Sequence, residues 1–171
     1  MLIGDYNRNG VVDAGEDVVF ISLTDAVKLL TGKEKDMADG VVKIGRDVVA
    51  TWLNYLEGNG IGLPTDDQSP HHFIDDAIDY LQMYGDADPN TATNDASFDV
   101  FSWSHGGVKT GTSAWTGPIP GDLAMHSGAD VHSALDYYNN TGMTSPGGTP
   151  YAHDADDSMF LTALKIYESI I

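Results

Sequence analysis

An internal repeat in the first third of the chain restricts the possible folds more than any other feature of the sequence. The segment GVVDAGEDVVFISL, which begins at Gly10, matches GVVKIGRDVVATWL, which begins at Gly40, at a constant offset of thirty residues. Eight positions are identical without a gap. Because a fixed-period repeat usually marks a duplicated structural unit, residues 1–58 are predicted to contain two copies of a loop followed by a helix.

Both copies run into a pattern of apolar residues at helical spacing. Such a pattern gives a helix one apolar stripe, and two facing stripes pack against each other. The two predicted helices end near Gly32 and Gly58, because glycine accepts the left-handed conformation that ends many helices. The stripes are Val19, Leu23, Ala26, Val27 and Leu30 in the first copy, and Val49, Trp52, Leu53 and Leu56 in the second.

The first loop has the residue pattern of a calcium site. In a twelve-residue EF-hand loop the ligands come from places 1, 3, 5, 7, 9 and 12, and glycine at place 6 permits a sharp turn. Gly10 stands at the glycine place. A metal-free turn rich in Asn and Asp is the alternative, but it does not require a carboxylate at place 12. The predicted calcium ligands are Asp5, Asn7, Asn9, Val11 (through its carbonyl), Asp13 and Glu16.

The second loop keeps the framework of the first but not its ligands. In the same register Lys35 stands at place 1 and Arg46 at place 12. Two positive side chains oppose a cation, so we expect no calcium in this copy. We expect instead that Lys35 or Arg46 pairs with Asp39 in the space that a metal would occupy.

The arrangement of one calcium loop without an entering helix, one following helix and a second copy about thirty residues later resembles a dockerin. This resemblance covers residues 4–58 and implies a paired half-EF-hand fold, calcium as the cofactor and a cohesin-type protein partner. Glu16 at place 12 departs from the Asp that the resemblance implies. The degenerate second loop and the attached 110 or so residues depart from it as well.

The second part of the chain is predicted to contain about three further helices. Ser69 and Pro70 are a cap and a first helical residue for a helix over 70–84. The segments GADVHSALDYYNN (128–140) and DDSMFLTALKIYESII (156–171) show similar apolar stripes. Between residues 85 and 128 lies a long stretch rich in Gly, Ser and Thr, of a kind that usually has a function or a bound ligand.

That long stretch contains a second, incomplete calcium pattern. Asp86, Asp88 and Asn90 repeat the 1-3-5 spacing, but Thr91 stands where the loop requires Gly. A weaker calcium site is therefore predicted at these three residues.

The histidines suggest a different metal chemistry. All six lie between His71 and His153, in the acidic second part. Imidazole beside carboxylate is the ligand set of many zinc and iron sites, although no H-E-x-x-H spacing occurs. Helix capping and hydrogen bonding are the alternative roles, and they are the interpretation of His71 and His72. The candidate transition-metal ligands are His126, His132, His153, Asp154 and Asp156.

The charge of the chain limits its partners. A formal net charge of −18 disfavours nucleic acids and anionic membranes, which would repel it, and favours cations. No apolar run approaches the ~20 residues of a membrane span. The chain has no cysteine, and together with the calcium loop and acidity this resembles calcium-loaded extracellular proteins of bacteria. The first residues show no export signal, so we expect a segment of a longer protein.

These features together predict a mainly α-helical protein. A dockerin-like unit over 1–58 is expected to pack with a loop-rich helical part over 59–171. The predicted function is a calcium-binding structural, adhesion or interaction module of a secreted or surface bacterial protein, whose partner is of cohesin type or another domain of its own chain. A metal-dependent enzyme that uses the histidines and acids of the second part is the alternative.

Overall fold

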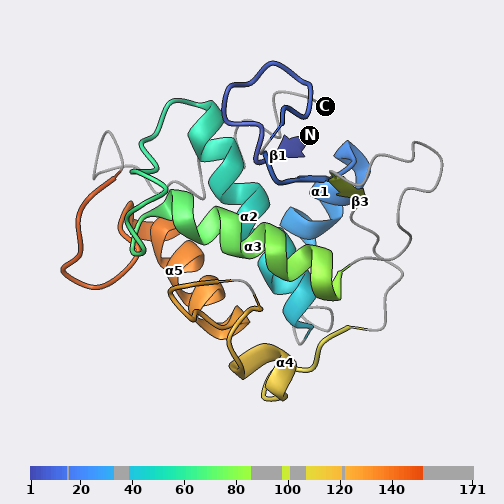
Figure 1. Ribbon diagram of the computed structural model, residues 1–171, viewed down its shortest axis with the longest axis vertical. Coiled ribbons are helices and arrows are strands. Elements are labelled where there is room, and N and C mark those ends of the chain that lie inside the picture. The colour runs from blue at the N-terminus through green and yellow to red at the C-terminus, as the bar shows by residue number, and fades with distance from the viewer. Residues whose placement is uncertain (15, 33–38, 86–97, 101–106, 121, 152–171) are drawn as a thin grey trace.

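Three helices that pack on one another form the centre of the computed structural model (Figure 1). They are α2 (Gly40–Leu56), α3 (Pro70–Tyr84) and α5 (Gly128–Thr141). The structure describes residues 1–14, 16–32, 39–85, 98–100, 107–120 and 122–151. Because α2 contacts both α3 and α5, residues from the two predicted parts share one apolar core.

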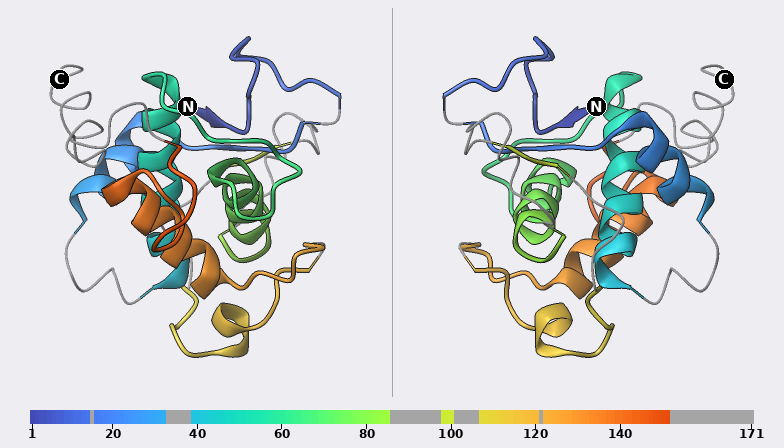
Figure 2. Two further views of the ribbon diagram at one scale, coloured as in Figure 1. Left: turned by 90° about the vertical axis from the view of Figure 1, so that its left-hand side faces the viewer. Right: turned by 90° about the vertical axis from the view of Figure 1, so that its right-hand side faces the viewer.

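Smaller elements surround these helices. Helix α1 (Leu23–Thr31) packs on α2, and the short α4 (Ser113–Thr116) contacts α5. Strand β2 (Val18–Phe20) pairs antiparallel with β1 (Leu2–Ile3) and parallel with β3 (Phe98–Val100). The loop between β1 and β2 and helix α4 lie at opposite ends of the long axis (Figures 1 and 2).

The prediction of a mainly helical protein is confirmed. Helix α3 begins at Pro70 as expected, and the Ser69 side chain accepts a hydrogen bond from the His72 backbone N–H. Helix α5 begins with a capping box between Ser127 and Asp130. The helix expected over 156–171 lies outside the described residues. In the part of the chain that is described, no helix is long and apolar enough to cross a membrane.

The first copy of the repeat differs from its prediction at the helix start. The stripe was expected from Val19, but Val19 lies in β2 opposite Ile3, and the helix begins only at Leu23. The reason is local. β-Branched valines suit a strand, and Ser22 caps the helix by accepting from the Asp25 backbone N–H at 3.1 Å.

The second copy is helical throughout its described part. Residues 40–46, expected as the end of a degenerate loop, form the first turns of α2, with Asp39 accepting a hydrogen bond from the Val41 backbone N–H. Arg46 does not pair with Asp39 as expected. Its Nη2 lies 2.6 Å from Asp47 Oδ1 and 3.4 Å from Asp136 Oδ1. Lys35 lies outside the described residues. The two copies are therefore not equivalent loop and helix units.

A buried polar network connects α2 with α5. Asn139 accepts hydrogen bonds from Thr51 and from the Asn54 amide, both at 3.1 Å, and donates to the Asp47 carbonyl at 2.9 Å. His132 Nδ1 lies 2.5 Å from Asp47 Oδ2. Because buried polar groups need their partners, these contacts fix one register between the two helices.

Candidate metal sites

The loop between β1 and β2 is closed by the residues that the sequence predicts as calcium ligands. Asp5 is only 5% exposed. Its two oxygens accept hydrogen bonds from the backbone N–H groups of Asn9 at 3.2 Å and Gly10 at 2.8 Å. Gly10 has a φ of +74°, which glycine adopts without steric cost. The sharp turn that a cation-binding loop requires at its sixth place is therefore present.

Two carboxylates and two amides share the centre of this loop. Asn7 and Asn9 each donate through Nδ2 to Asp13 Oδ2 at 2.7 Å. Asn7 also donates to Glu16 Oε1 at 3.1 Å, and Glu16 Oε2 accepts from the Asp13 backbone N–H at 3.0 Å. The apolar Val11 side chain has no ligand atom and points to solvent, so only its backbone carbonyl could bind an ion. The amide donors thus bring partial positive charge to the carboxylates that would bind a cation.

The loop is seated on α2 and α3. The Tyr6 ring packs edge-on against Trp52, with 5.4 Å between the centroids, and its hydroxyl donates to Asp75 Oδ1 at 2.5 Å. Arg8 lies over the Tyr55 ring at 4.1 Å and donates to the Tyr55 carbonyl at 2.7 Å. Any ion that orders this loop would therefore also act on the core helices.

The other two predicted metal sites lie wholly or partly outside the described residues. Asp86, Asp88 and Asn90 of the second calcium pattern lie outside those residues, as do His153, Asp154 and Asp156. His132 pairs with Asp47 and packs near Trp115, with 5.8 Å between the ring centroids. His126 has different partners, so these two histidines of the predicted transition-metal set do not share ligand neighbours.

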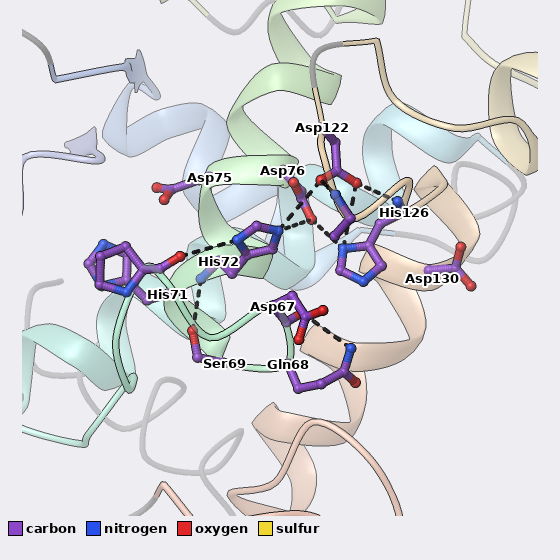
Figure 3. A network of polar contacts seen from close by, with 12 residues as sticks. Asp67, Gln68, Ser69, His71, His72, Asp75, Asp76, Asp122, His126 and Asp130 are labelled. Carbon is purple, nitrogen blue, oxygen red and sulfur yellow. Dashed lines mark hydrogen bonds and ion pairs between the residues drawn. The ribbon is translucent and has the colours of Figure 1, made fainter.

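His126 belongs instead to a compact group of two histidines and two aspartates, which we name the His/Asp cluster. In this group one ligand atom from each residue lies within 4.8 Å of all the others. Figure 3 shows the four side chains pointing toward one another. Two come from α3, one turn apart, and two come from the connection before α5. The members are His72, Asp76, Asp122 and His126.

The distances within the His/Asp cluster are of two kinds. His126 Nδ1 lies 2.8 Å from Asp76 Oδ2, which is a hydrogen-bond distance. The other contacts are longer. His126 Nδ1 lies 3.6 Å from Asp122 Oδ2, and His72 Nε2 lies 3.5 Å from Asp122 Oδ1 and 3.7 Å from Asp76 Oδ2. These three exceed a good hydrogen bond, although the groups face one another.

The ring of His72 is oriented by a contact on its far side. Its Nδ1 lies 3.3 Å from the Pro64 carbonyl oxygen, which can only accept a hydrogen bond, so Nδ1 carries the proton in that contact. In the neutral form of the ring, Nε2 then presents its lone pair to the cluster. This Nε2 atom is buried and has no hydrogen-bond partner.

Asp122 is held by the backbone that follows it. Its Oδ1 accepts from the Ala124 N–H at 2.7 Å, and its Oδ2 accepts from the His126 N–H. Met125, between those residues, has a φ of +64°, an uncommon conformation for a residue with a side chain. The Asp122 carboxylate thus shapes the turn that brings His126 to α3.

Burial and charge raise the pKa values of two cluster members. Burial, with Asp122 nearby, raises the pKa of Asp76 to about 6 despite the hydrogen bond from His126. Burial acts to lower the pKa of His72, but the Asp76 and Asp122 carboxylates outweigh it and raise the pKa above its ordinary value. Both shifts have the same sense, because burial of Asp76 and the carboxylates around His72 favour added positive charge in the cluster.

The sequence interpretation missed three members of the His/Asp cluster. His72 was assigned a structural role, and Asp76 and Asp122 were not considered. A signal was present, because His72 and Asp76 are four residues apart on a predicted helix and therefore share a face. The distance of 46 residues between Asp76 and Asp122 hid the second half of the cluster.

Comparisons with models of protein families, with curated proteins and with solved structures found no match to this chain. Its function is therefore proposed from its own residues and their geometry.

Proposed function

We propose that this chain is a calcium-binding structural or interaction module of an extracellular bacterial protein, with the ion bound by the loop from Asp5 to Glu16. The observation that carries the proposal is the closed loop itself. Asp5 is buried at its base, Gly10 makes the turn, and the Asp13 and Glu16 carboxylates meet the same Asn7 amide. Oxygen ligands at this spacing suit a hard cation such as calcium.

The residues present fit calcium in number and chemistry. Asp5, Asp13 and Glu16 supply carboxylates, Asn7 and Asn9 supply amide oxygens, and Val11 supplies a carbonyl. The Nδ2 atoms of Asn7 and Asn9 face Asp13. Rotation of each amide about its terminal torsion would bring oxygen to that place. The rotation would break the hydrogen bonds that the two Oδ1 atoms accept from the backbone N–H groups of Asn9 at 2.9 Å and Val11 at 2.7 Å, so the ion must compensate for them.

Calcium at this loop would stabilise the fold. The loop contacts α2 and α3 through Tyr6 and Arg8, so an ion that binds only the folded loop also holds those contacts. At a calcium concentration one hundred times Kd the gain is about 2.7 kcal/mol. The free energy of unfolding of a typical domain is roughly 5–15 kcal/mol, so extracellular calcium would supply a large share of the stability of this fold.

The dockerin resemblance supports the proposal through the first loop. Since residues 40–46 are helical, we do not extend the resemblance to a symmetric pair of loops. A cohesin-type protein or another domain of the parent chain is the proposed partner. The alternative of an enzyme built on His126 and His132 has less support, because the two side chains pair with different aspartates.

Calorimetric titration with calcium tests the proposal. Wild-type protein is expected to bind one calcium at this loop, and Glu16→Gln is expected to weaken binding by at least about tenfold because it removes a charged bidentate ligand. Glu57→Gln is the matched control, since Glu57 is exposed at the end of α2. Equal affinities for wild type and Glu16→Gln would refute the assignment.

A further inference from the structure

We propose that the His/Asp cluster is a second metal site, distinct from the calcium loop, that binds one tetrahedral transition-metal ion such as zinc and fastens the start of α3 to the connection before α5. The proposal rests on the positions and chemistry of His72, Asp76, Asp122 and His126, and it does not depend on calcium binding at the N-terminal loop.

The geometry matches a shared metal better than it matches direct pairing. With bonds of 2.0–2.1 Å to a tetrahedral zinc ion, neighbouring ligand atoms lie about 3.3 Å apart. His72 Nε2 lies 3.5 Å from Asp122 Oδ1 and 3.7 Å from Asp76 Oδ2, and His126 Nδ1 lies 3.6 Å from the other Asp122 oxygen, Oδ2. These distances are too long for good hydrogen bonds. With one ligand atom from each residue, all four atoms lie within 4.8 Å of one another, so a common ion would draw them closer together. The 2.8 Å contact between His126 and Asp76 needs only a small opening.

The surroundings of His72 are those of a metal-bound histidine. Such histidines usually donate the other ring N–H to a carbonyl or carboxylate, which fixes the tautomer and aims the ligand nitrogen. Here the Pro64 carbonyl accepts from Nδ1. The buried Nε2, which no hydrogen bond in the structure satisfies, is the atom that faces Asp76 and Asp122. A buried polar atom of this kind requires a partner.

Charge and burial favour a divalent ion. The Asp76 and Asp122 side chains are 4% and 0% exposed, and His72 and His126 are 21% and 13% exposed. Two buried carboxylates in proximity are unfavourable unless positive charge compensates them. Two neutral imidazoles, two carboxylates and one divalent cation together are electrically neutral.

The ligand types select the class of metal. Calcium requires six to eight oxygens, whereas half of this set is imidazole nitrogen. Imidazole suits zinc and other first-row transition metals. Four protein ligands complete a tetrahedral shell and leave no position for substrate, which is the pattern of a structural zinc site. The inferred role is therefore structural and not catalytic.

Residues 122–127, the segment that the metal would hold, bury few apolar side chains against the rest of the protein. Leu123 and Met125 are 97% and 66% exposed, so burial of these side chains does not attach the segment to the body. Asp122 and His126 are the residues that reach α3, and the His126 ring also packs on Phe73 with 4.7 Å between centroids. A metal at the cluster would thus determine how firmly residues 122–127 are held.

Metal titration of histidine variants tests this proposal. The full chain, stripped with chelator and returned to millimolar calcium, is titrated with zinc and with cobalt. We expect one equivalent of each, and a visible spectrum typical of tetrahedral cobalt. Loss of second-shell partners alone weakens metal sites 10–100-fold, so His72→Gln and His126→Gln are each expected to weaken zinc binding by at least about 100-fold.

His132→Gln is the matched control, because His132 is also half-buried and paired with an aspartate but lies outside the cluster. It is expected to keep wild-type zinc affinity. The far-UV spectrum and the urea unfolding curve of each variant report whether it is folded. Amide exchange of residues 122–127 is expected to slow when zinc binds the wild type but not His72→Gln.

Absence of stoichiometric zinc or cobalt in the wild type would overturn the proposal. Retained zinc in folded His72→Gln and His126→Gln would also overturn it, because the ion would then lie elsewhere. A cobalt spectrum of five or six ligands would contradict the closed shell. Failure of the calcium proposal would look different, because the protein would then bind no calcium while the zinc results of these variants stayed the same.

Discussion

Replacement of Asp79 by Asn is expected to stabilise the protein at neutral pH. Asp79 is half-buried on α3, and burial together with the nearby Asp17 carboxylate raises its pKa from 3.8 to about 6. The folded state therefore binds a proton more readily than the unfolded chain between those two values. By linkage, the wild-type protein loses stability as pH rises from about 4 through about 6. Asparagine has nearly the same shape but carries no charge, so it removes this loss.

The size of the effect follows from the pKa difference. A shift from 3.8 to about 6 corresponds to about 3 kcal/mol at ~1.4 kcal/mol per unit. Because Asp79 is only half-buried, solvent screening reduces this to about 1 kcal/mol. The gain should be complete at pH 7 and should disappear near pH 4, where Asp79 is protonated in both states.

Urea unfolding of wild type and Asp79→Asn at several pH values between 4 and 7, in chelator, measures the effect. The difference between the two proteins isolates Asp79 from other carboxyl groups of α3. Asp67→Asn, a change of the same kind at an exposed site, is the control and should show no pH-dependent gain. If Asp79→Asn is equally or less stable than wild type at pH 7, the reasoning about burial and Asp17 is wrong.

Two further substitutions test the packing around the loop and the repeat. Tyr6→Phe keeps the ring contacts but removes the donor to the half-buried Asp75 carboxylate at 2.5 Å. Thermal unfolding should therefore show a loss of about 1.5–3 kcal/mol, and a loss below about 0.5 kcal/mol would show that Asp75 finds another donor. Gly40→Ala places a Cβ 2.5 Å from the Trp115 ring, so urea unfolding should show a loss of stability of about 1–3 kcal/mol from overpacking. Helix propensity alone predicts a gain of stability, and such a gain would refute the close contact.

Local signals in the sequence predicted the parts of the fold that depend on neighbouring residues. Ser69 and Pro70 mark the start of α3 because a cap and a fixed φ act within one turn. The apolar stripe over 128–140 predicted α5 in the same local way, although its cap at Ser127 was not predicted. The loop from Asp5 to Glu16 is also local, and its backbone turn at Gly10 is the one that its spacing predicts.

The His/Asp cluster could not be predicted in the same way. His72 and Asp76 share a helix face, but nothing near them in the sequence indicates that Asp122 and His126 lie opposite. That proximity depends on the packing of α3 with α5 and on the turn at Met125. Long-range packing is set by the whole core, and a single sequence without its relatives carries little information about it.

The repeat shows how identical residues can fold differently when their surroundings differ. Gly10 and Gly40 occupy the same position of the two copies. Gly10 is needed for its φ of +74° and has open space around it, whereas Gly40 is needed because Trp115 and Tyr80 lie where a side chain would be. The valines behave similarly, since Val18 and Val19 pair within the sheet and Val48 and Val49 are buried on α2. Neither copy has a strong intrinsic preference for strand or helix, because valine favours strands only weakly and tertiary contacts override such preferences.

The carboxylates that close the first loop are replaced by Lys43 and Arg46 in the second copy. Without those carboxylates, residues 40–46 gain more from helical hydrogen bonds and from burial against α3 and α5 than from a turn. The same framework therefore becomes a loop closed by its own oxygen-bearing side chains where these are present and a core helix where they are not.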